Sequence, residues 1–205
     1  MIREKKKIAI VTPDLKHRSG VSVIAKFLFD VINATDDLCA ELISVSTSRH
    51  DANSVKLMNP KTWREKIKVT QVIETDLSYR HVGANLTEIE LFRYRPRRVL
   101  DEILSEFDFV QIVAGAPSWL LVAENFAGKT ALQVATLNGK ERESVTKKTP
   151  QPHKIWLQTM NKINAQLEKR AFKLADAIFI ENYWLKEILD KKFAEKTFFA
   201  PPGID

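Results

Sequence analysis

The chain has 205 residues, of which 44% are hydrophobic and 28% are charged, a balance typical of globular proteins. This length predicts one large domain whose core needs no disulfide or metal for stability, and the single cysteine, Cys39, cannot form an internal disulfide. An apolar stretch of the roughly 18 residues that a membrane-spanning helix requires is missing. The first residues also lack the apolar region of a secretory signal, so we expect a cytoplasmic protein.

The net charge of +6 is concentrated in one part of the sequence. Residues 138–173 contain nine Lys and Arg against three Glu, so the rest of the chain is neutral overall. Such a segment is typical of surfaces that meet phosphates, acidic lipid headgroups or nucleic acid, although a solvated helix face explains it equally well. Nucleic acid is the weakest of these partners, because we expect no exposed aromatic residues among the charges. The basic residues are Lys140, Arg142, Lys147, Lys148, Lys154, Lys162, Lys169, Arg170 and Lys173.

The first part of the chain predicts a strand, a helix and two further strands. Lys7–Thr12 is a short β-branched run that ends at Pro13, which is typical of a buried strand. Apolar residues then recur at helical spacing from Val21 to Ile32, with Ser19 in the N-cap position. The segments that follow are a strand at 42–46, a polar irregular stretch at 49–63 and a strand at 68–73.

The remainder alternates helices with strands. An apolar helical stripe from Leu86 to Phe107 contains Pro96, which predicts a break with Pro96 opening the second piece. The segments that follow are strands at 109–113, 130–137, 177–180 and 197–200, helices at 117–125, 154–174 and 182–192, and a polar loop at 138–152. Trp156 falls on the apolar stripe of its helix and is predicted to lie in the core. Because most of these strands are apolar throughout, we expect a mostly parallel sheet with helices on both faces, which is a doubly wound, Rossmann-like α/β domain.

One motif imitates a phosphate-binding loop. Ala123–Thr130 (AENFAGKT) fits a relaxed form of the pattern, with Ala in place of the first glycine. A true phosphate loop follows a strand and opens a helix, so that backbone amides converge on the phosphates, whereas this motif follows a helical stretch and precedes a strand. The favoured interpretation is a glycine cap at Gly128 that ends the helix. A nucleotide enzyme that uses Gly128, Lys129 and Thr130 is the less favoured alternative.

The turn after the first strand is a candidate anion site. Pro13–Val21 combines a loop with basic residues and a helix that begins at Ser19 and Gly20. A helix N-terminus presents unpaired amides and partial positive charge, and glycine lets an anion approach the backbone. A simple capped helix is an equally good interpretation of these residues, and the G-x-G-x-x-G fingerprint of dinucleotide-binding folds is missing from the turn.

The end of the 130–137 strand is a second candidate. In open parallel sheets, ligands bind outside the carboxyl ends of the strands, which is where Asn138, Gly139 and Lys140 are expected to lie. Asn138 can orient a substrate but cannot titrate near neutral pH, and an ordinary Asn-Gly turn is the alternative. Trp119 follows another strand end and could line the same cleft, and Arg142 extends the basic loop beside it. The chain shows no spacing of histidines or carboxylates typical of a metal site.

Two segments carry a resemblance to a known family. They are Lys7–Phe29 and Gln166–Asp205, the latter including Glu168, the Ala175-Asp-Ala-Ile run and the final Pro201–Asp205. Together they resemble the retaining glycosyltransferases of family 4. The resemblance implies that residues 1–200 are the N-terminal, acceptor-side Rossmann-like domain of a two-domain GT-B architecture. Residues 201–205 would then begin the crossing to a second, donor-binding domain that this sequence does not contain.

The resemblance also implies a reaction. The whole enzyme would transfer a sugar from a nucleotide diphosphate sugar to an acceptor hydroxyl, with retention of configuration and without a metal or a cofactor. The 205 residues alone are expected to be inactive, because most donor contacts would lie in the second domain. No catalytic residue is assigned.

Particular residues match or depart from the pattern of that family. Gly20 matches the second glycine of a pair that contacts the donor diphosphate, and Ser19 stands in place of the first. Asn138 stands where the family usually has a histidine near the transferred sugar. Glu181 and Pro202 replace a usual serine and asparagine. The resemblance therefore points to Ser19 and Gly20 for the donor phosphates, and to a cleft of Asn138, Gly139, Lys140, Arg142 and Trp119 for the acceptor.

The acceptor implied by this resemblance is a glycan or a lipid-linked or phosphorylated molecule. Lys140, Arg142, Lys147 and Lys148 could hold its charge, or rest the domain on an anionic membrane. Lys147 and Lys148 are assigned specifically to contact with an anionic acceptor or a membrane. Peripheral association with the inner face of the membrane is thus left open beside a purely cytoplasmic location. A non-catalytic α/β binding or regulatory domain is the main alternative function.

Overall fold

The structure, a computed structural model, describes residues 5–16, 19–74 and 77–201. Within these residues, eight strands form one sheet in the order β3-β4-β2-β1-β5-β6-β7-β8. All neighbouring strands are parallel except β3 and β4, which pair antiparallel at one edge. The strands are β1 (Lys6–Pro13), β2 (Leu38–Val45), β3 (Val69–Glu74), β4 (Leu77–Val82), β5 (Phe109–Ala114), β6 (Lys129–Val134), β7 (Ala177–Ile180) and β8 (Thr197–Phe199). The predicted α/β fold with a mostly parallel sheet is confirmed.

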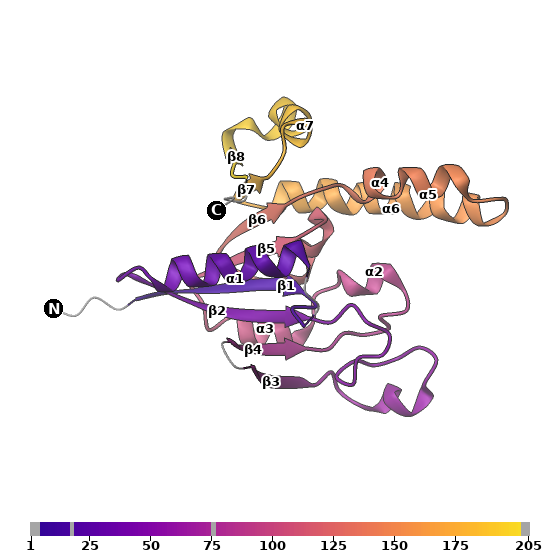
Figure 1. Ribbon diagram of the computed structural model, residues 1–205. Helices are drawn as coiled ribbons and strands as arrows, with labels where there is room; N and C mark the ends of the chain where they lie inside the picture. Colours follow the sequence, from indigo (N-terminus) through magenta and orange to yellow (C-terminus); the bar gives the residue numbers. More distant parts are fainter. Residues whose placement is uncertain (1–4, 17–18, 75–76, 202–205) are drawn as a thin grey trace.

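The order of the strands creates a switch point in the middle of the sheet. β1 pairs with β2 on one side and with β5 on the other. Strands β2 to β4 therefore lie on one side of β1, and strands β5 to β8 lie on the other. The arrowheads of β1, β2 and β4 point toward α2 and the hairpin formed by α5 and α6 (Figure 1). In open α/β sheets this edge, at the switch point, is the usual place of a ligand site.

Helices cover both faces of the sheet. The α-helices are α1 (Gly20–Asn33), α2 (Glu90–Arg93), α3 (Arg98–Leu104), α4 (Asn138–Glu141), α5 (Glu143–Lys148), α6 (His153–Leu174) and α7 (Tyr183–Phe193). Short 3-10 helices are η1 (Pro60–Arg64), η2 (Pro117–Ala123) and η3 (Ala194–Lys196). In Figure 1, α1 lies in front of the central strands and α3 lies behind them.

The core is divided between the two faces. On the α1 side, Ala25 packs with Ile10, Leu42, Tyr79 and Val113 of four different strands. The larger cluster, on the opposite face, combines strand residues with buried residues of α3, η2, α6 and α7. Helix α1 begins as predicted, because the side chain of Ser19 accepts a hydrogen bond from the backbone N–H of Ser22 in a capping box.

The helical cover of the α1 face is incomplete. A row of apolar side chains on α1, formed by Val23, Phe27 and Val31, is about half exposed or more. At the far edge of the sheet, Phe179 of β7 and Phe198 of β8 are register partners with ring centroids 5.6 Å apart, and Phe198 is 50% exposed. The buried residues of the later helices belong to the cluster on the other face, so the outer edge of this face, at Phe198, meets water.

Several predicted elements need correction. Strand β4 was not predicted, and its Tyr79 is fully buried in the core. The polar loop predicted at 138–152 is wrong, because α4 and α5 occupy most of it. The break at Pro96 is confirmed, but α3 begins only at Arg98. Trp156 was predicted to be in the core and is 59% exposed, because the first turns of α6 project beyond the sheet (Figure 1).

The predicted glycine cap at Gly128 is also wrong. Helix η2 ends at Ala123, and Gly128 does not have the left-handed backbone that such a cap uses. A Cβ at this position would lie 2.7 Å from the ring of Phe126 and 2.9 Å from the carbonyl oxygen of Asp108. Glycine is therefore required here for space. Of the crossing predicted at 201–205, all but Pro201 lies outside the described residues.

Candidate functional site

Four neighbouring strands end in buried polar side chains that lack a partner in the described part of the chain. In sheet order they are Ser46 after β2, Thr12 at the end of β1, Ser118 in η2 after β5, and Asn138 after β6. Each of the four residues is at most 4% exposed. Buried polar atoms without partners are rare in folded proteins and usually have a functional or solvent-related reason. These four surround the switch point, so the carboxyl edge of the sheet is the candidate site.

The N-terminus of α1 belongs to this edge. Ser19 and Gly20 follow the turn after β1, and both are exposed. The backbone N–H of Ser19 donates to Ser22 Oγ, whereas the N–H groups of Gly20 and Val21 make no hydrogen bond to any described residue. A Cβ at Gly20 would have open space around it. The first turn of α1 therefore presents free donors toward solvent. Residues 17 and 18, which precede it in the sequence, lie outside the described residues.

Asn138 is held beneath the surface by Glu168. Its backbone N–H donates to Glu168 Oε1 at 2.7 Å, and both side chains are almost fully buried. Burial raises the pKa of Glu168, and the hydrogen bond from the backbone N–H of Asn138 only partly opposes this effect. Asn138 was predicted to orient a substrate in the cleft. At 4% exposure it instead anchors the start of α4, and Gly139 and Lys140 lie above it.

A second polar cluster ties α2 to the α4–α5 link. Arg142 donates to both carboxylate oxygens of Glu90, at 2.9 and 2.5 Å, and Glu90 also accepts hydrogen bonds from Tyr94 and Asn164. Burial works to raise the pKa of Glu90, but the hydrogen bonds and charge of Arg142, with the hydrogen bonds from Tyr94 and Asn164, together lower the pKa. Desolvation, with Glu90 nearby, raises the pKa of Tyr94 strongly. Arg142 was predicted to hold an acceptor, and this ion pair already occupies its guanidinium.

Trp119 does not line a cleft as predicted. It is 9% exposed and packs edge-on against Tyr94, with ring centroids 5.1 Å apart. The sequence-based prediction failed because η2 turns its apolar side chains inward directly after β5. A different tryptophan lies at the surface of this edge. Trp184 of α7 and Lys140 of α4 are both in the wall of an open groove of about 580 Å³, together with Thr136 at the end of β6.

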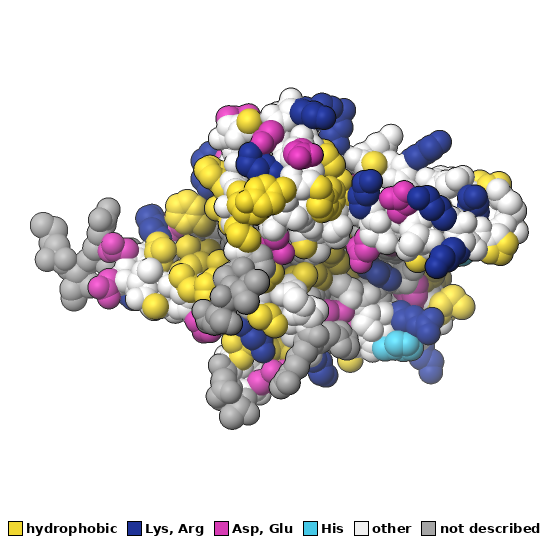
Figure 2. Space-filling model, turned by 45° about the horizontal axis from the view of Figure 1, so that its top comes forward, with side chains coloured by type: hydrophobic (Ala, Val, Ile, Leu, Met, Phe, Trp, Pro, Cys, Tyr) yellow, Lys and Arg dark blue, Asp and Glu magenta, His cyan; other side chains and the backbone are white. Residues whose placement is uncertain are grey.

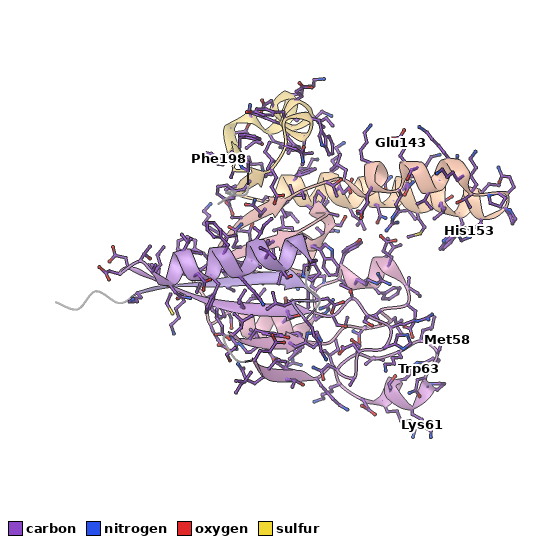
Figure 3. All side chains as sticks on the ribbon, viewed as in Figure 1. Met58, Lys61, Trp63, Glu143, His153 and Phe198 are labelled. Carbon is purple, nitrogen blue, oxygen red and sulfur yellow. The ribbon has the colours of Figure 1, made fainter. Side chains whose placement is uncertain are left out.

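The remaining predicted basic residues lie on α5. Lys147 donates to Glu143 at 2.7 Å, and Lys140 lies 3.7 Å from the same carboxylate. Lys148 is exposed and has no ion-pair partner among the described residues. Figure 2 shows Lys and Arg side chains spread along the projecting helices. Figure 3 places Glu143 on the outer side of this hairpin and His153 near its far end.

Sequence reasoning missed a third polar cluster, near the end of β4. His81 lies between Ser44 Oγ, 3.0 Å from its Nδ1, and Asp51 Oδ1, 3.2 Å from its Nε2. Burial works to raise the pKa of Asp51, but hydrogen bonds with His81, Ser54 and the backbone of Asn53 hold it far below 3.8. The sequence offered little signal for this contact, because Asp51 lies in the polar, irregular segment and His81 in the strand that was not predicted.

The phosphate-loop alternative does not have the required geometry. Lys129 and Thr130 begin β6 at the amino edge of the sheet, away from the candidate site. The Lys129 amine donates to Asp176 at 2.7 Å, and the Thr130 backbone N–H donates to the other oxygen of the same carboxylate at 2.9 Å. These groups close the turn before β7, and the segment leads into a strand rather than a helix.

Two properties bear on what the protein can bind or cross. Among the described residues, no three histidine, cysteine or carboxylate side chains gather in a way that could hold a metal ion. In the same part of the chain, every helix is too short or too polar to span a bilayer.

Comparison with known proteins adds no identification. No protein-family model and no curated protein matches this chain.

Proposed function

We propose that this chain is the acceptor-side domain of a retaining, metal-independent GT-B glycosyltransferase similar to family 4. The observation that carries the proposal is the carboxyl edge of the sheet, where four adjacent strands end in buried, unpartnered polar atoms around a switch point. The sequence resemblance of Lys7–Phe29 and Gln166–Asp205 supplies the reaction. A second domain that binds most of the nucleotide diphosphate sugar is part of the proposal.

The first turn of α1 is the proposed contact for the donor diphosphate. The free N–H groups of Gly20 and Val21 and the partial positive charge of a 14-residue helix favour an anion there. Ser19 contributes through the cap, because its side chain keeps this turn in place. No side chain at Gly20 obstructs the approach of a phosphate.

The groove beside α4 is the proposed place of the acceptor. Its lining residues are Thr136, Lys140, Glu141, Trp184, Glu187 and Ile188. An aromatic face with carboxylates and a cation beside it suits the ring and hydroxyl groups of a sugar acceptor. Asn138 and Arg142 take supporting roles in this arrangement, because one anchors α4 and the other ties it to α2. This assignment replaces the cleft role that the sequence suggested for Trp119.

The donor contact can be tested on the chain itself by NMR titration with UDP, GDP and ATP at millimolar concentration. We expect one nucleoside diphosphate to shift the amide signals of Gly20 and Val21, without any sugar transfer by the chain alone. Gly20→Asp places a carboxylate in the first turn, which stabilises the helix but repels a diphosphate. Gly20→Ala adds no charge and is the matched control.

The outcomes separate the alternatives. Shifts at α1 that persist in Gly20→Ala and vanish in Gly20→Asp support the proposal. Shifts from ATP at Lys129 and Thr130 would favour a phosphate-loop enzyme instead. If no nucleotide perturbs α1 in the wild-type chain, the donor contact is wrong and the non-catalytic binding domain becomes the better explanation.

We also propose that the tip of the α5–α6 hairpin rests on an anionic membrane. Residues 144–167 contain four lysines and no acidic residue, and Val145, Ile155 and Trp156 are each more than half exposed on them. The hairpin extends well beyond the sheet (Figure 1). Tryptophan and aliphatic residues among lysines are typical of helices that lie in the membrane interface, and each basic residue near such a surface contributes about 1 kcal/mol.

Vesicle co-sedimentation tests this surface. We expect binding to vesicles that contain phosphatidylglycerol and none to pure phosphatidylcholine. Lys147→Gln with Lys148→Gln should weaken binding about fivefold per lysine, whereas the same changes at Lys191 and Lys192 of α7 should have a smaller effect. Trp156→Ala should weaken binding, whereas Trp63→Ala, which alters an equally exposed tryptophan, should not. Equal effects of both lysine pairs, or no effect of Trp156→Ala, would contradict the proposed surface.

A further inference from the structure

A second cavity lies beside α2, apart from the groove at α4. It has a volume of about 590 Å³ and is open to solvent on one side, a size that suits a small organic ligand. Its wall is mostly apolar or aromatic, with three polar residues. The lining residues are Val55, Leu57, Trp63, Asn85, Leu86, Phe92, Arg95, Pro96 and Arg97. Figure 3 shows Trp63 with Met58 and Lys61 on the lobe that carries η1.

Backbone hydrogen bonds hold two sides of this cavity together. Val55 N–H donates to Ala84 O at 2.9 Å, and Leu86 N–H donates to Val55 O at 2.7 Å. Leu86 has a φ of +51°, a left-handed conformation that a leucine rarely adopts. Backbone strain of this kind persists where the surrounding structure imposes it, and it occurs preferentially at ligand sites. The rim between the η1 lobe and the 83–86 turn is therefore rigid.

Trp63 presents a fixed aromatic surface on one side of the cavity. Its indole N–H donates to Lys56 O at 2.8 Å, while the side chain stays 58% exposed. On another side, the Phe92 ring carries the guanidinium of Arg95, 4.4 Å from the ring centroid. Arg95 is exposed, so its side chain can move without loss of buried contacts.

Arg97 forms the unusual part of the wall. It is 3% exposed, and the only hydrogen bond from its side chain to a described residue runs from Nη2 to the carbonyl oxygen of Arg93 at 2.7 Å. Nε and Nη1 are buried and have no partner among the described residues. Burial lowers the pKa of Arg97 to about 10, against a smaller opposing effect from Asp51. The guanidinium is thus still charged at neutral pH, in a place where an unpaired charge is costly.

We propose that this cavity binds a small organic anion that carries a ring. The anionic group, a phosphate monoester or a carboxylate, accepts a hydrogen bond from an unpartnered N–H of Arg97, at Nε or at Nη1, and the ring packs between Trp63 and Phe92. A hydrogen bond between a guanidinium and such an anion is charge-assisted and therefore strong. Arg95 lies on the Phe92 ring in the free protein, so its exposed side chain moves aside when the ring of the ligand takes that place.

This proposal is independent of glycosyl transfer. It rests on Arg97, Trp63 and Leu86, none of which belongs to the α1 turn or the α4 groove. A ligand of this class could be an acceptor, a product or a regulator of whatever reaction occurs at the carboxyl edge. If the donor experiment at Gly20 fails, the proposed anion site at Arg97 is not affected. If the anion site at Arg97 fails its test, the proposed donor contact at Gly20 is not affected.

The test uses four probes with the wild-type chain: inorganic phosphate, phenol, phenyl phosphate and benzoate. NMR follows the indole N–H signal of Trp63, assigned by its loss in Trp63→Phe, and calorimetry gives the affinities. We expect phenyl phosphate or benzoate to bind at least tenfold more tightly than phosphate or phenol alone, because only they satisfy both halves of the site. The tighter of the two identifies the anionic group.

Variants then separate a ligand site from a structural arginine. Arg97→Met should weaken binding of the preferred anion at least tenfold, leave phenol binding unchanged and leave the melting temperature equal or higher, since it removes an unpaired buried charge. Arg98→Met is the matched control, because the neighbouring Arg98 is exposed and pairs only with Glu102. The proposal is overturned if no probe binds to the wild type. It is also overturned if Arg97→Met unfolds the protein and the anion still binds equally well to Arg97→Lys and Arg97→Gln.

Discussion

Glu168 and Asn138 are joined by a 2.7 Å hydrogen bond in which a buried carboxylate on α6 accepts the N–H that begins α4. This contact fixes the short helix above the carboxyl end of β6. Glu168 has no ion-pair partner among the described residues, and burial raises its pKa more than this hydrogen bond and the charge of Arg142 lower it. The geometry of the candidate site and the pH dependence of folding are therefore linked at this pair.

Glu168→Gln should stabilise the protein at neutral pH. An acid whose pKa is raised by folding contributes stability below its ordinary pKa of 4.5, and that contribution is lost as pH rises through the higher folded value. Glutamine keeps an oxygen for the Asn138 N–H but carries no charge. Thermal melts should give the variant the higher melting temperature at pH 7, with the difference vanishing near pH 4. Glu168→Ala, which lacks the acceptor, should melt lower at both pH values.

Asp51→Asn should show the opposite pH dependence. Hydrogen bonds with His81 and Ser54 lower the pKa of Asp51 despite its burial, so its stabilisation is present above 3.8 and disappears as pH falls through the folded value. We expect a loss of about 1–3 kcal/mol at pH 7 by denaturant titration. The gap to the wild type should narrow below pH 3.8. Asp190→Asn on the surface of α7 serves as control, and an equal loss there would disprove a special role for Asp51.

Glu90→Gln should loosen α4 from α2. The change leaves Arg142, which is 30% exposed at its side chain, without its carboxylate partner, and we expect a loss of about 1–2 kcal/mol of unfolding free energy. Glu102→Gln removes an exposed partner of Arg98 and should cost less than about 0.5 kcal/mol. Hydrogen exchange of α4 and α5 should increase only in the first variant. Unchanged exchange would mean that the Asn138 contact holds α4 by itself.

Gly83→Ala should be strongly destabilising. A Cβ at Gly83 would collide with the backbone carbonyl group of Asn53, in the segment that is pinned to the end of β4. Backbone atoms there cannot give way without breaking the hydrogen bond from Lys68 N–H to Asn53 O. We expect a loss above about 2 kcal/mol, whereas Gly139→Ala, which has open space, should be neutral or slightly stabilising. Denaturant midpoints of the two variants give the comparison.

Much of the fold was predictable from local patterns. The strand Ala177–Ile180 is a continuous apolar run, and in the helix that ends at Leu174 apolar residues recur at helical spacing. Strand β4 escaped prediction because Arg80 and His81 interrupt its pattern, and both find partners only in the folded chain, Arg80 with Glu41 and His81 with Asp51. The local sequence around β4 does not indicate which distant residues these two side chains will contact.

The site was less predictable than the fold. The positions of Ser19, Gly20 and Lys140 at the carboxyl edge followed from strand order alone. The burial of Trp119, Asn138 and Arg142 did not, because burial depends on what packs above a residue. Arg97 illustrates the limit: the run Arg95-Pro-Arg-Arg looks like solvated surface, yet one of its three arginines is buried and the two beside it are exposed.

The uneven covering of the sheet sets the order in which the molecule should open. β8 is only three residues long, lies at an edge and has water on the side of Phe198, whereas β1 is sandwiched between neighbours and layers. Local opening should therefore begin at β8 and β7 and release the Gln133 amide from Glu181 and Ala200. The central strands would stay closed. The α1 turn and the strand ends at the switch point therefore belong to the last part of the protein to unfold, whereas the wall of the groove that Trp184 of α7 forms should be released early.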